Sequence, residues 1–437
     1  MIDRIFTERH REGRVALASL EGMIRDSSHR CGAIILERIL ESEDGASLNQ
    51  TCPCGGHVRR RKYQSKTLVT VLGAVRLRRA RHQCDRCGRW RVREDEVLDV
   101  VGTRFSPGLR RMMAKLGAEV CFDKARELLG ELAGITVTAK EVERWAEGIG
   151  DDIGKKGEAG RLDATAGQTP DRPSPETGEA APTLYIAMDG TGIPVVRKET
   201  QGRTGKAPDG IARTREVKLG AVFTQTGNDQ DGKPVRDRAS TSYVGKIEKA
   251  EAFGPRVYTE ACRRGLCHTA TAVILGDGAP WIWNLADEYF PGAIQILDYY
   301  HAKEHLGDLS KILYPADAHQ QNTWMNRMTE RLWNGDIRGL IANLWAERTK
   351  RNQKAAIETV IGYFEKNRHR MRYGTFREAG LFIGSGVIEA GCKAVIGKRL
   401  KQSGMHWSVR GANAIIALRC HIESERFDGY WKDRCAA

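Results

Sequence analysis

The stretch Val273-Ile-Leu-Gly-Asp-Gly-Ala-Pro-Trp281 decides how the second half of the chain is organised. Its apolar, β-branched start predicts a buried strand that delivers Asp277 to its carboxyl end. Gly278 permits a sharp turn, and Pro280 stands where the first turn of a helix would begin. We therefore expect Asp277 to be exposed at a strand tip.

Other acids stand in comparable settings. The apolar run 293–297 leads to Asp298, with His301 three residues further on, and Asp189 ends another apolar run upstream. Downstream, Glu389 lies among small and apolar residues on a predicted helix, where a carboxylate usually has a partner. The sequence therefore predicts a divalent-metal site made of three carboxylates: Asp189, Asp277 and Glu389.

Size and charge narrow the class of protein. The chain has 437 residues, 41% of them hydrophobic, which suggests two or three domains with packed cores. Its formal net charge of +14 favours polyanionic partners, either nucleic acid or an anionic membrane surface. It has no apolar run of about 18 residues and no signal-peptide pattern near Met1. The 11 cysteines are odd in number and mostly scattered, so we expect a cytoplasmic, nucleoid-associated protein with reduced thiols.

The first hundred residues divide into two predicted units. Residues 1–50 have the apolar spacing of a helical arm, to which no chemistry is assigned. In residues 51–100, two cysteine pairs flank two short strands that turn at Gly73, an arrangement that resembles a zinc ribbon. One pair has a single intervening residue, so His57 is an alternative ligand, and four free cysteines are the alternative to zinc. The expected structural zinc ligands are Cys52, Cys54, Cys84 and Cys87.

The same hairpin carries most of the net charge. From Arg59 to Arg93 there are 13 Lys or Arg and one acid, so this segment contributes +12 (13 − 1) of the +14. Although such a run is often only a solvated face, this density is typical of a surface that binds phosphate backbones. The expected DNA contacts here are Arg59, Arg60, Arg61, Lys62, Arg76, Arg78, Arg79 and Arg81.

Residues 101–153 are predicted to form a helix-turn-helix-like DNA-binding domain. Ser106-Pro107 begins one helix, a second follows over 124–133, and Thr138 with Glu141 has the pattern of a capping box. Paired short helices are equally common in proteins that do not bind DNA. Residues 154–182, rich in Gly, Pro and Thr, are predicted to be a linker.

Residues 183–437 are predicted to be a mixed α/β catalytic domain. Strands are expected over 184–188, 215–224, 273–275 and 294–297, and helical sequence follows the last two. The interval from Asp277 to Glu389 is 112 residues (389 − 277), which is too long for one crossover. Its tryptophan-bearing part predicts a helical insertion over about 317–372.

Four motifs in this domain resemble those of a known family: Asp189-Gly-Thr-Gly, Gly276-Asp-Gly-Ala-Pro-Trp281, Leu297-Asp-Tyr-Tyr-His301 and Gly386-Val-Ile-Glu-Ala-Gly-Cys-Lys393, followed by Arg399-Leu-Lys-Gln-Ser-Gly-Met-His-Trp407. In this order, within a resemblance that covers most of the chain from Cys52 to Ile422, they are similar to DDE transposases of the ISKra type of bacterial insertion sequences. The resemblance implies a ribonuclease-H-like core with an all-helical insertion, and a function in DNA transposition and recombination of a mobile element. It makes Asp189, Asp277 and Glu389 the catalytic triad. Asp298 and His301 match the Asp-x-x-His signature that lies near the active site in related Mutator-like and hAT-like transposases.

The implied partners are double-stranded DNA, both terminal inverted repeats and target DNA, and further copies of the chain in a synaptic complex. The chemistry suits the residues, because phosphodiester cleavage and strand transfer are in-line displacements that two Mg²⁺ or Mn²⁺ ions roughly 3.5–4 Å apart accelerate. Such hard cations take carboxylate oxygens. Four basic residues after Glu389 are further candidates for phosphate contacts: Lys393, Lys398, Arg399 and Lys401.

Each assignment has an alternative. Asp189 and Asp277 precede glycine, as turn residues often do, and Glu389 has the alternative of a solvated helix residue. His301 has the alternative of a core histidine bonded to backbone. A non-catalytic zinc-ribbon regulator explains the basic hairpin and leaves the acids without a role. A glycoside hydrolase uses paired carboxylates but does not need the basic half. A structure-specific nuclease cuts without joining.

Overall fold

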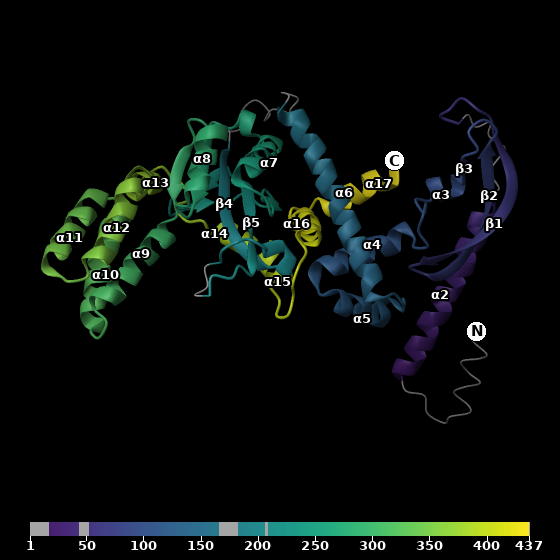
Figure 1. The fold of residues 1–437 in the computed structure, drawn as a ribbon, viewed down its shortest axis with the longest axis horizontal. Coiled ribbons are helices and arrows are strands. Elements are labelled where there is room, and N and C mark those ends of the chain that lie inside the picture. Colours follow the sequence, from purple (N-terminus) through teal and green to yellow (C-terminus); the bar gives the residue numbers. More distant parts are fainter. Residues whose placement is uncertain (1–16, 43–51, 166–181, 206–208, 437) are drawn as a thin grey trace. The chain divides into compact units, whose positions relative to one another are not determined.

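The computed structural model describes residues 17–42, 52–165, 182–205 and 209–436. The chain forms two compact units (Figure 1). Unit 1 comprises residues 1–148 and 428–437, and unit 2 comprises residues 149–427. No helix in the described part of the chain is long and apolar enough to cross a membrane.

Unit 1 begins with a long antiparallel hairpin. Helix α2 (Leu17–Ser42) precedes β1 (Val58–Thr70) and β2 (Gly73–Cys84), and a short β3 (Trp90–Arg91) extends the sheet in the order β1-β2-β3. The hairpin turns at Gly73, as predicted, where φ is +107°. Its strands are longer than expected because their turn end has a small core of its own, formed by Leu68, Leu77 and Val100. Helix α3 (Arg93–Val97) follows the sheet.

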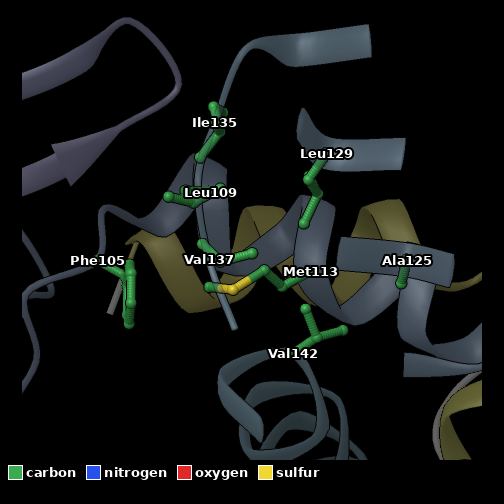
Figure 2. Packing of buried hydrophobic residues seen from close by; sticks show 8 residues of the cluster. All are labelled: Phe105, Leu109, Met113, Ala125, Leu129, Ile135, Val137 and Val142. Atoms are coloured by element: carbon green, nitrogen blue, oxygen red, sulfur yellow. The ribbon is translucent and has the colours of Figure 1, made fainter. Parts of the chain in front are cut away.

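Three helices follow: α4 (Pro107–Glu119) and α5 (Phe122–Ala133) lie in unit 1, and α6 (Ala139–Thr165) begins in unit 1 and continues into unit 2 after residue 148. The predicted caps are present. The Ser106 hydroxyl accepts a hydrogen bond from the Leu109 amide, and Thr138 and Glu141 form the reciprocal capping box. Figure 2 shows the core that these helices share, with Leu109, Met113 and Val142 pointing toward one another.

Helix α6 differs from the expectation that a linker begins at residue 154. It continues to Thr165, and residues 166–181 of the expected linker lie outside the described residues. The extension is stabilised by tertiary contacts, because the Glu158 carboxylate accepts hydrogen bonds from Lys246 and Arg256. Although burial acts to raise it, these two cations hold the pKa of Glu158 at about 2, well below its ordinary value of 4.5.

Unit 2 is a mixed α/β unit built on a five-stranded sheet in the order β10-β9-β4-β5-β8. Strand β4 is antiparallel to β5, β5 is antiparallel to β8, and β9 and β10 run parallel to β4. A separate two-stranded ribbon, β6 (Gly227–Asn228) with β7 (Pro234–Val235), follows β5. The five strands are β4 (Thr183–Pro194), β5 (Thr214–Gln225), β8 (Ser242–Lys246), β9 (Thr271–Gly276) and β10 (Ile294–Leu297).

Helices cover both faces of this sheet. A Cβ placed on Gly220 of β5 would touch Val257 of α7 (Ala250–Arg263), which packs on one face. A Cβ on Gly245 of β8 would touch Ile416 of α16 (Val409–Glu423), which packs on the other. The remaining elements near the sheet are η1 (Arg197–Thr200), η2 (Leu266–His268), α8 (Pro280–Tyr289), α14 (Gly386–Gly391), the π-helical η4 (Cys392–Gly397) and α15 (Lys398–Leu400).

The segment between Asp277 and Glu389 is largely helical, in agreement with the sequence. Helices α9 to α12 pack on one another (Figure 1). They bury apolar residues such as Trp324, Leu340 and Phe364. Their bounds, with those of the elements that follow, are α9 (Tyr299–Leu313), α10 (Ala318–Trp333), α11 (Ile337–Lys350), α12 (Lys354–Asn367), η3 (Arg368–Arg370), α13 (Tyr373–Glu378) and, at the far end of the chain, α17 (Phe427–Ala436).

Candidate active site

Asp189 lies inside β4 and not at its tip, which corrects the expectation from its apolar run. The strand continues to Pro194 because β5 pairs with it along its whole length, whereas the parallel pairing with β9 stops at Ala187. Asp189 is therefore paired on one side only. Its cross-strand neighbour is Leu219, which faces α14 and α16, so the Asp189 carboxylate belongs to that face of the sheet.

A cysteine thiol from η4, the turn that follows α14, contacts the Asp189 carboxylate. Cys392, the first residue of η4, donates its Sγ–H to Asp189 Oδ2 at 3.3 Å, while Oδ1 accepts the Gly190 amide at 2.7 Å. Burial raises the pKa of Asp189, with the Asp277 charge acting in the same direction; the bonds from Cys392 and Gly190 and the nearby His301 oppose it. Burial and the neighbouring carboxylates of Asp189 and Glu389 raise the pKa of the Cys392 thiol, which stays protonated as a donor.

Asp277 follows β9 directly, as predicted. Its Oδ1 accepts the Ala279 amide at 3.0 Å, and Gly278 makes the sharp turn with φ of +98° before α8 begins at Pro280. The residue is half-buried and not exposed as expected, because the turn folds back over it. Asp277 therefore combines the turn role that was its alternative with a position electrostatically close to Asp189.

Glu389 lies on α14, a short helix that continues directly into the π-helical η4, and its side chain is exposed. π-helical turns are rare and often occur at functional sites. The fully buried Arg419 of α16 bonds to η4. Its guanidinium donates hydrogen bonds to the carbonyl oxygens of Ala394 at 2.6 Å and Val395 at 2.9 Å. The Arg419 guanidinium thus stabilises the irregular turn that presents Cys392 to Asp189.

The three predicted carboxylates share one region but do not touch. The charge of Asp277 acts on Asp189, and Cys392, which follows Glu389 by three residues, is hydrogen-bonded to Asp189. Among the described residues, however, the only group whose three or more ligand atoms all lie within 4.8 Å of one another is a set of cysteines. Like charges repel, so carboxylates that hold a cation are expected to converge only with the cation between them. Oxygen ligands of this kind fit Mg²⁺ or Mn²⁺.

Asp298 and His301 occupy different kinds of position. Asp298 is 1% exposed, and its carboxylate caps α9 by accepting the His301 amide at 2.8 Å and also accepts the Ser385 amide at 2.5 Å. It thereby joins the start of α9 to the residue before α14. The half-buried His301 ring lies 3.5 Å from Glu304 and acts electrostatically on Asp189.

The candidate phosphate contacts after Glu389 divide in two. Lys393, Lys398 and Lys401 are exposed, and Lys401 donates to the Thr191 hydroxyl of β4 at 2.5 Å. Arg399 is fully buried over the Trp407 ring and donates to Met405 Sδ, so the prediction that it contacts phosphate is wrong for this structure. The spacing of these four basic residues along the sequence did not indicate that Arg399 is the buried one.

Sequence reasoning missed several neighbours of the site. Cys392 was part of a quoted motif but had no role of its own. His305 and Tyr363 also lie here, and their only signal is the spacing of His301 and His305, which places both on one face of α9.

The cysteines of unit 1 form the expected cluster. The Sγ atoms of Cys52 and Cys87 are 3.6 Å apart, and those of Cys54 and Cys84 are 3.5 Å apart. His57, the alternative ligand, is not part of the group. The tight fit explains the glycine after the first pair, because a Cβ on Gly56 would lie 2.7 Å from Cys84 Sγ.

This cluster suits zinc. The amide of Gly56, and after it the thiol of Cys52, lower the pKa of Cys54 to about 7, which favours the thiolate that a metal needs. Four cysteine sulfurs are a common ligand set of structural zinc. The set can therefore hold a metal such as zinc.

The basic hairpin beside this cluster is exposed along much of its length. Residues 59–65 of β1 are open to solvent, and Arg78 stacks on the Tyr63 ring at 4.3 Å. Exposed basic residues among the predicted contacts are Arg59, Arg60, Arg61, Lys62, Arg76 and Arg78, and Arg81 is half-buried over Trp90. Arg79 is the exception. It is 8% exposed and bonds, with Lys66, to the buried Asp95, so its predicted phosphate contact is wrong here.

Comparison with known proteins gives limited matches. Residues 265–433 match an uncharacterised protein family, UPF0236, over less than half of the chain. Among solved structures, the chain is similar to the Drosophila P element transposase strand transfer complex at 9% identity, covering 65% of this chain and 80% of that one. The TM-score of 0.19 is too low to indicate a shared fold. None of the curated proteins matches.

Proposed function

We propose that the chain is a DDE-type DNA transposase of a bacterial insertion sequence, of the ISKra type, with a ribonuclease-H-like core in unit 2. The observation that carries this proposal is the position of Asp189. It faces α14 from the central strand of the sheet and is hydrogen-bonded to Cys392, three residues beyond Glu389. The charge of Asp277 also acts to raise its pKa. The order of the strands, three antiparallel and then two parallel, also supports a ribonuclease-H-like core.

In this proposal, Asp189, Asp277 and Glu389 would hold two divalent ions, which would supply charge neutralisation for in-line displacement at phosphorus. The protein contributes the orientation: Cys392 fixes one oxygen of Asp189, the Ala279 amide fixes Asp277, and Asp298 ties α9 to the segment before α14. Water and then a freed 3′-hydroxyl would be the successive nucleophiles.

The exposed part of the hairpin is proposed to bind the terminal repeats. Its guanidinium and ammonium groups suit phosphate contacts, and the metal-binding cysteine cluster would keep the base of the hairpin rigid. A synaptic complex that joins two DNA ends would contain more than one copy of the chain.

The test is cleavage of a labelled duplex that carries the element's own ends, in Mg²⁺ or Mn²⁺. Asp277→Asn is expected to lower the cleavage rate by at least ~10³-fold, because loss of a metal ligand removes several kcal/mol of transition-state stabilisation. Asp308→Asn, which changes an exposed acid on α9, is the matched control and should cleave like the wild type. Equal cleavage by wild type and Asp277→Asn would refute the role of Asp277.

A strand-transfer assay separates transposase from nuclease. If the wild type cleaves but never joins the freed end to a second duplex, the chain is a structure-specific nuclease. If it binds the ends without cleaving in either metal, it is a regulator or an inactive copy of a transposase.

A further inference from the structure

Tyr363 has a covered hydroxyl without a partner. It lies on α12, in the helical segment between Asp277 and Glu389. Among the residues that the structure describes, its hydroxyl oxygen is buried and makes no hydrogen bond. Leaving a buried hydroxyl unpaired costs about 1–3 kcal/mol, so its retention suggests a partner that arrives later.

That hydroxyl lies against the turn that carries Asp277. A Cβ placed on Gly278 would lie 3.4 Å from the Tyr363 hydroxyl oxygen and 3.3 Å from its Cε2 atom. Burial, and after it the charges of Asp277 and Asp298, raise the pKa of this hydroxyl, so it remains a neutral donor at physiological pH. The carboxylate of Asp277, the residue before Gly278, is therefore an acceptor close to this hydroxyl, both by its place next to Gly278 and by its electrostatic effect.

The ring is fixed by packing and not by its hydroxyl. His305 of α9 lies against it with ring centroids 4.0 Å apart, and the adjacent Phe364 is buried. Burial, and after it the nearby His301, lower the pKa of His305, which is neutral at pH 7 and adds no charge beside the hydroxyl. The donor is thus held in a set direction before any partner is present.

We infer that Tyr363 is a positioning residue for Asp277. When one carboxylate oxygen of Asp277 binds a divalent ion, the other accepts a hydrogen bond from the Tyr363 hydroxyl. This inference rests on the proposed function. Carboxylates that bind metals are usually hydrogen-bonded by a second group, and loss of that group typically weakens metal binding by 10–100-fold. The helical segment would then contribute directly to the metal site of the sheet.

The experiment measures two properties of the full chain, with its cysteine cluster loaded with zinc. Mn²⁺ affinity is measured by electron paramagnetic resonance, and thermal stability is measured without Mn²⁺. Tyr363→Phe is expected to weaken Mn²⁺ binding by ~10–100-fold while its Tm stays equal to or above that of the wild type, because the lost hydroxyl had no partner. Tyr373→Phe is the contrasting control. Its hydroxyl donates to the Leu297 carbonyl at 3.0 Å, so this variant should lose stability and keep its Mn²⁺ affinity.

Two results would overturn the inference: unchanged Mn²⁺ affinity in Tyr363→Phe, or a loss of stability like that of Tyr373→Phe. Asp277→Asn identifies the Mn²⁺ ion in question, and a wild type that binds no ion through Asp277 also overturns the inference. If the wild type binds Mn²⁺ through Asp277 but does not cleave DNA, the proposed function fails while the affinity of Tyr363→Phe still decides the role of Tyr363.

Discussion

At the scale of single residues, Asp298 shows how an acid can matter at a site without touching the reacting atoms. Both of its oxygens are occupied by backbone amides, those of His301 and Ser385. The side chain is also almost fully buried, at 1% exposed. Its role in the proposed mechanism is therefore to fix the distance between the start of α9 and the segment before Glu389.

This role predicts the effect of removing the carboxylate. Asp298→Ala leaves two amides without their acceptor and should destabilise unit 2 by roughly 2–4 kcal/mol, whereas Asp298→Asn keeps one acceptor and should cost less. Urea unfolding followed by the tryptophans of unit 2 measures both. An Asp298→Ala protein that is fully stable but inactive would place Asp298 in the chemistry itself.

The sequence predicted the positions of the acids relative to the strands better than it predicted the side chains around them. Asp277 and Asp298 follow their strands as expected, because short apolar runs with a following Gly or helix are local signals. Asp189 was expected at a tip and lies within β4, because pairing with β5 decides where that strand ends. The contact of Tyr363 with Gly278 spans 85 residues (363 − 278) and that of Cys392 with Asp189 spans 203 (392 − 189), and no local pattern indicates them.

At the scale of elements, the hairpin and the π-helical turn are both irregular structures stabilised by something outside their own backbone. For η4 it is the buried Arg419 guanidinium, which bonds to two of its carbonyl oxygens. For the base of the hairpin it is the cysteine cluster, where the thiols of Cys52, Cys54, Cys84 and Cys87 meet.

The hairpin should therefore respond to metal. The wild type is expected to contain one equivalent of zinc per chain, and Cys84→Ser or a chelator should release it and increase amide hydrogen exchange in β1 and β2 near Val58 and Cys84. Exchange in α16 serves as the internal reference and should not change. A chain purified without zinc, with a hairpin already protected from exchange, would contradict this prediction.

At the scale of the whole molecule, the net charge of +14 is concentrated and not spread evenly. Of the basic residues that the sequence placed at phosphates, Arg79 and Arg399 turned out to be buried. The partner that draws Arg79 inward is Asp95, 16 residues away, so a count of charges along the chain could not identify it.

Salt dependence separates local contacts from overall charge. Replacing Arg59, Arg60, Arg61 and Lys62 together by Gln should reduce the slope of log Kd against log salt by about 0.9 for each lost phosphate contact, hence by up to about 3–4. The control changes four exposed cations of the helical segment to Gln, Arg338, Lys350, Lys354 and Lys366, and so alters net charge equally. Equal slopes in the two variants would mean that the hairpin is not the phosphate-binding surface.

The separation of the three acids along the chain also has a consequence in time. Glu389 follows Asp189 by 200 residues (389 − 189), and at ~5–20 residues per second a ribosome needs roughly 10–40 s to make that interval. The basic hairpin is complete well before then. Under the proposed function, prematurely terminated products that stop before Glu389 would hold DNA ends without cutting them and would act as competitive inhibitors of the full-length chain.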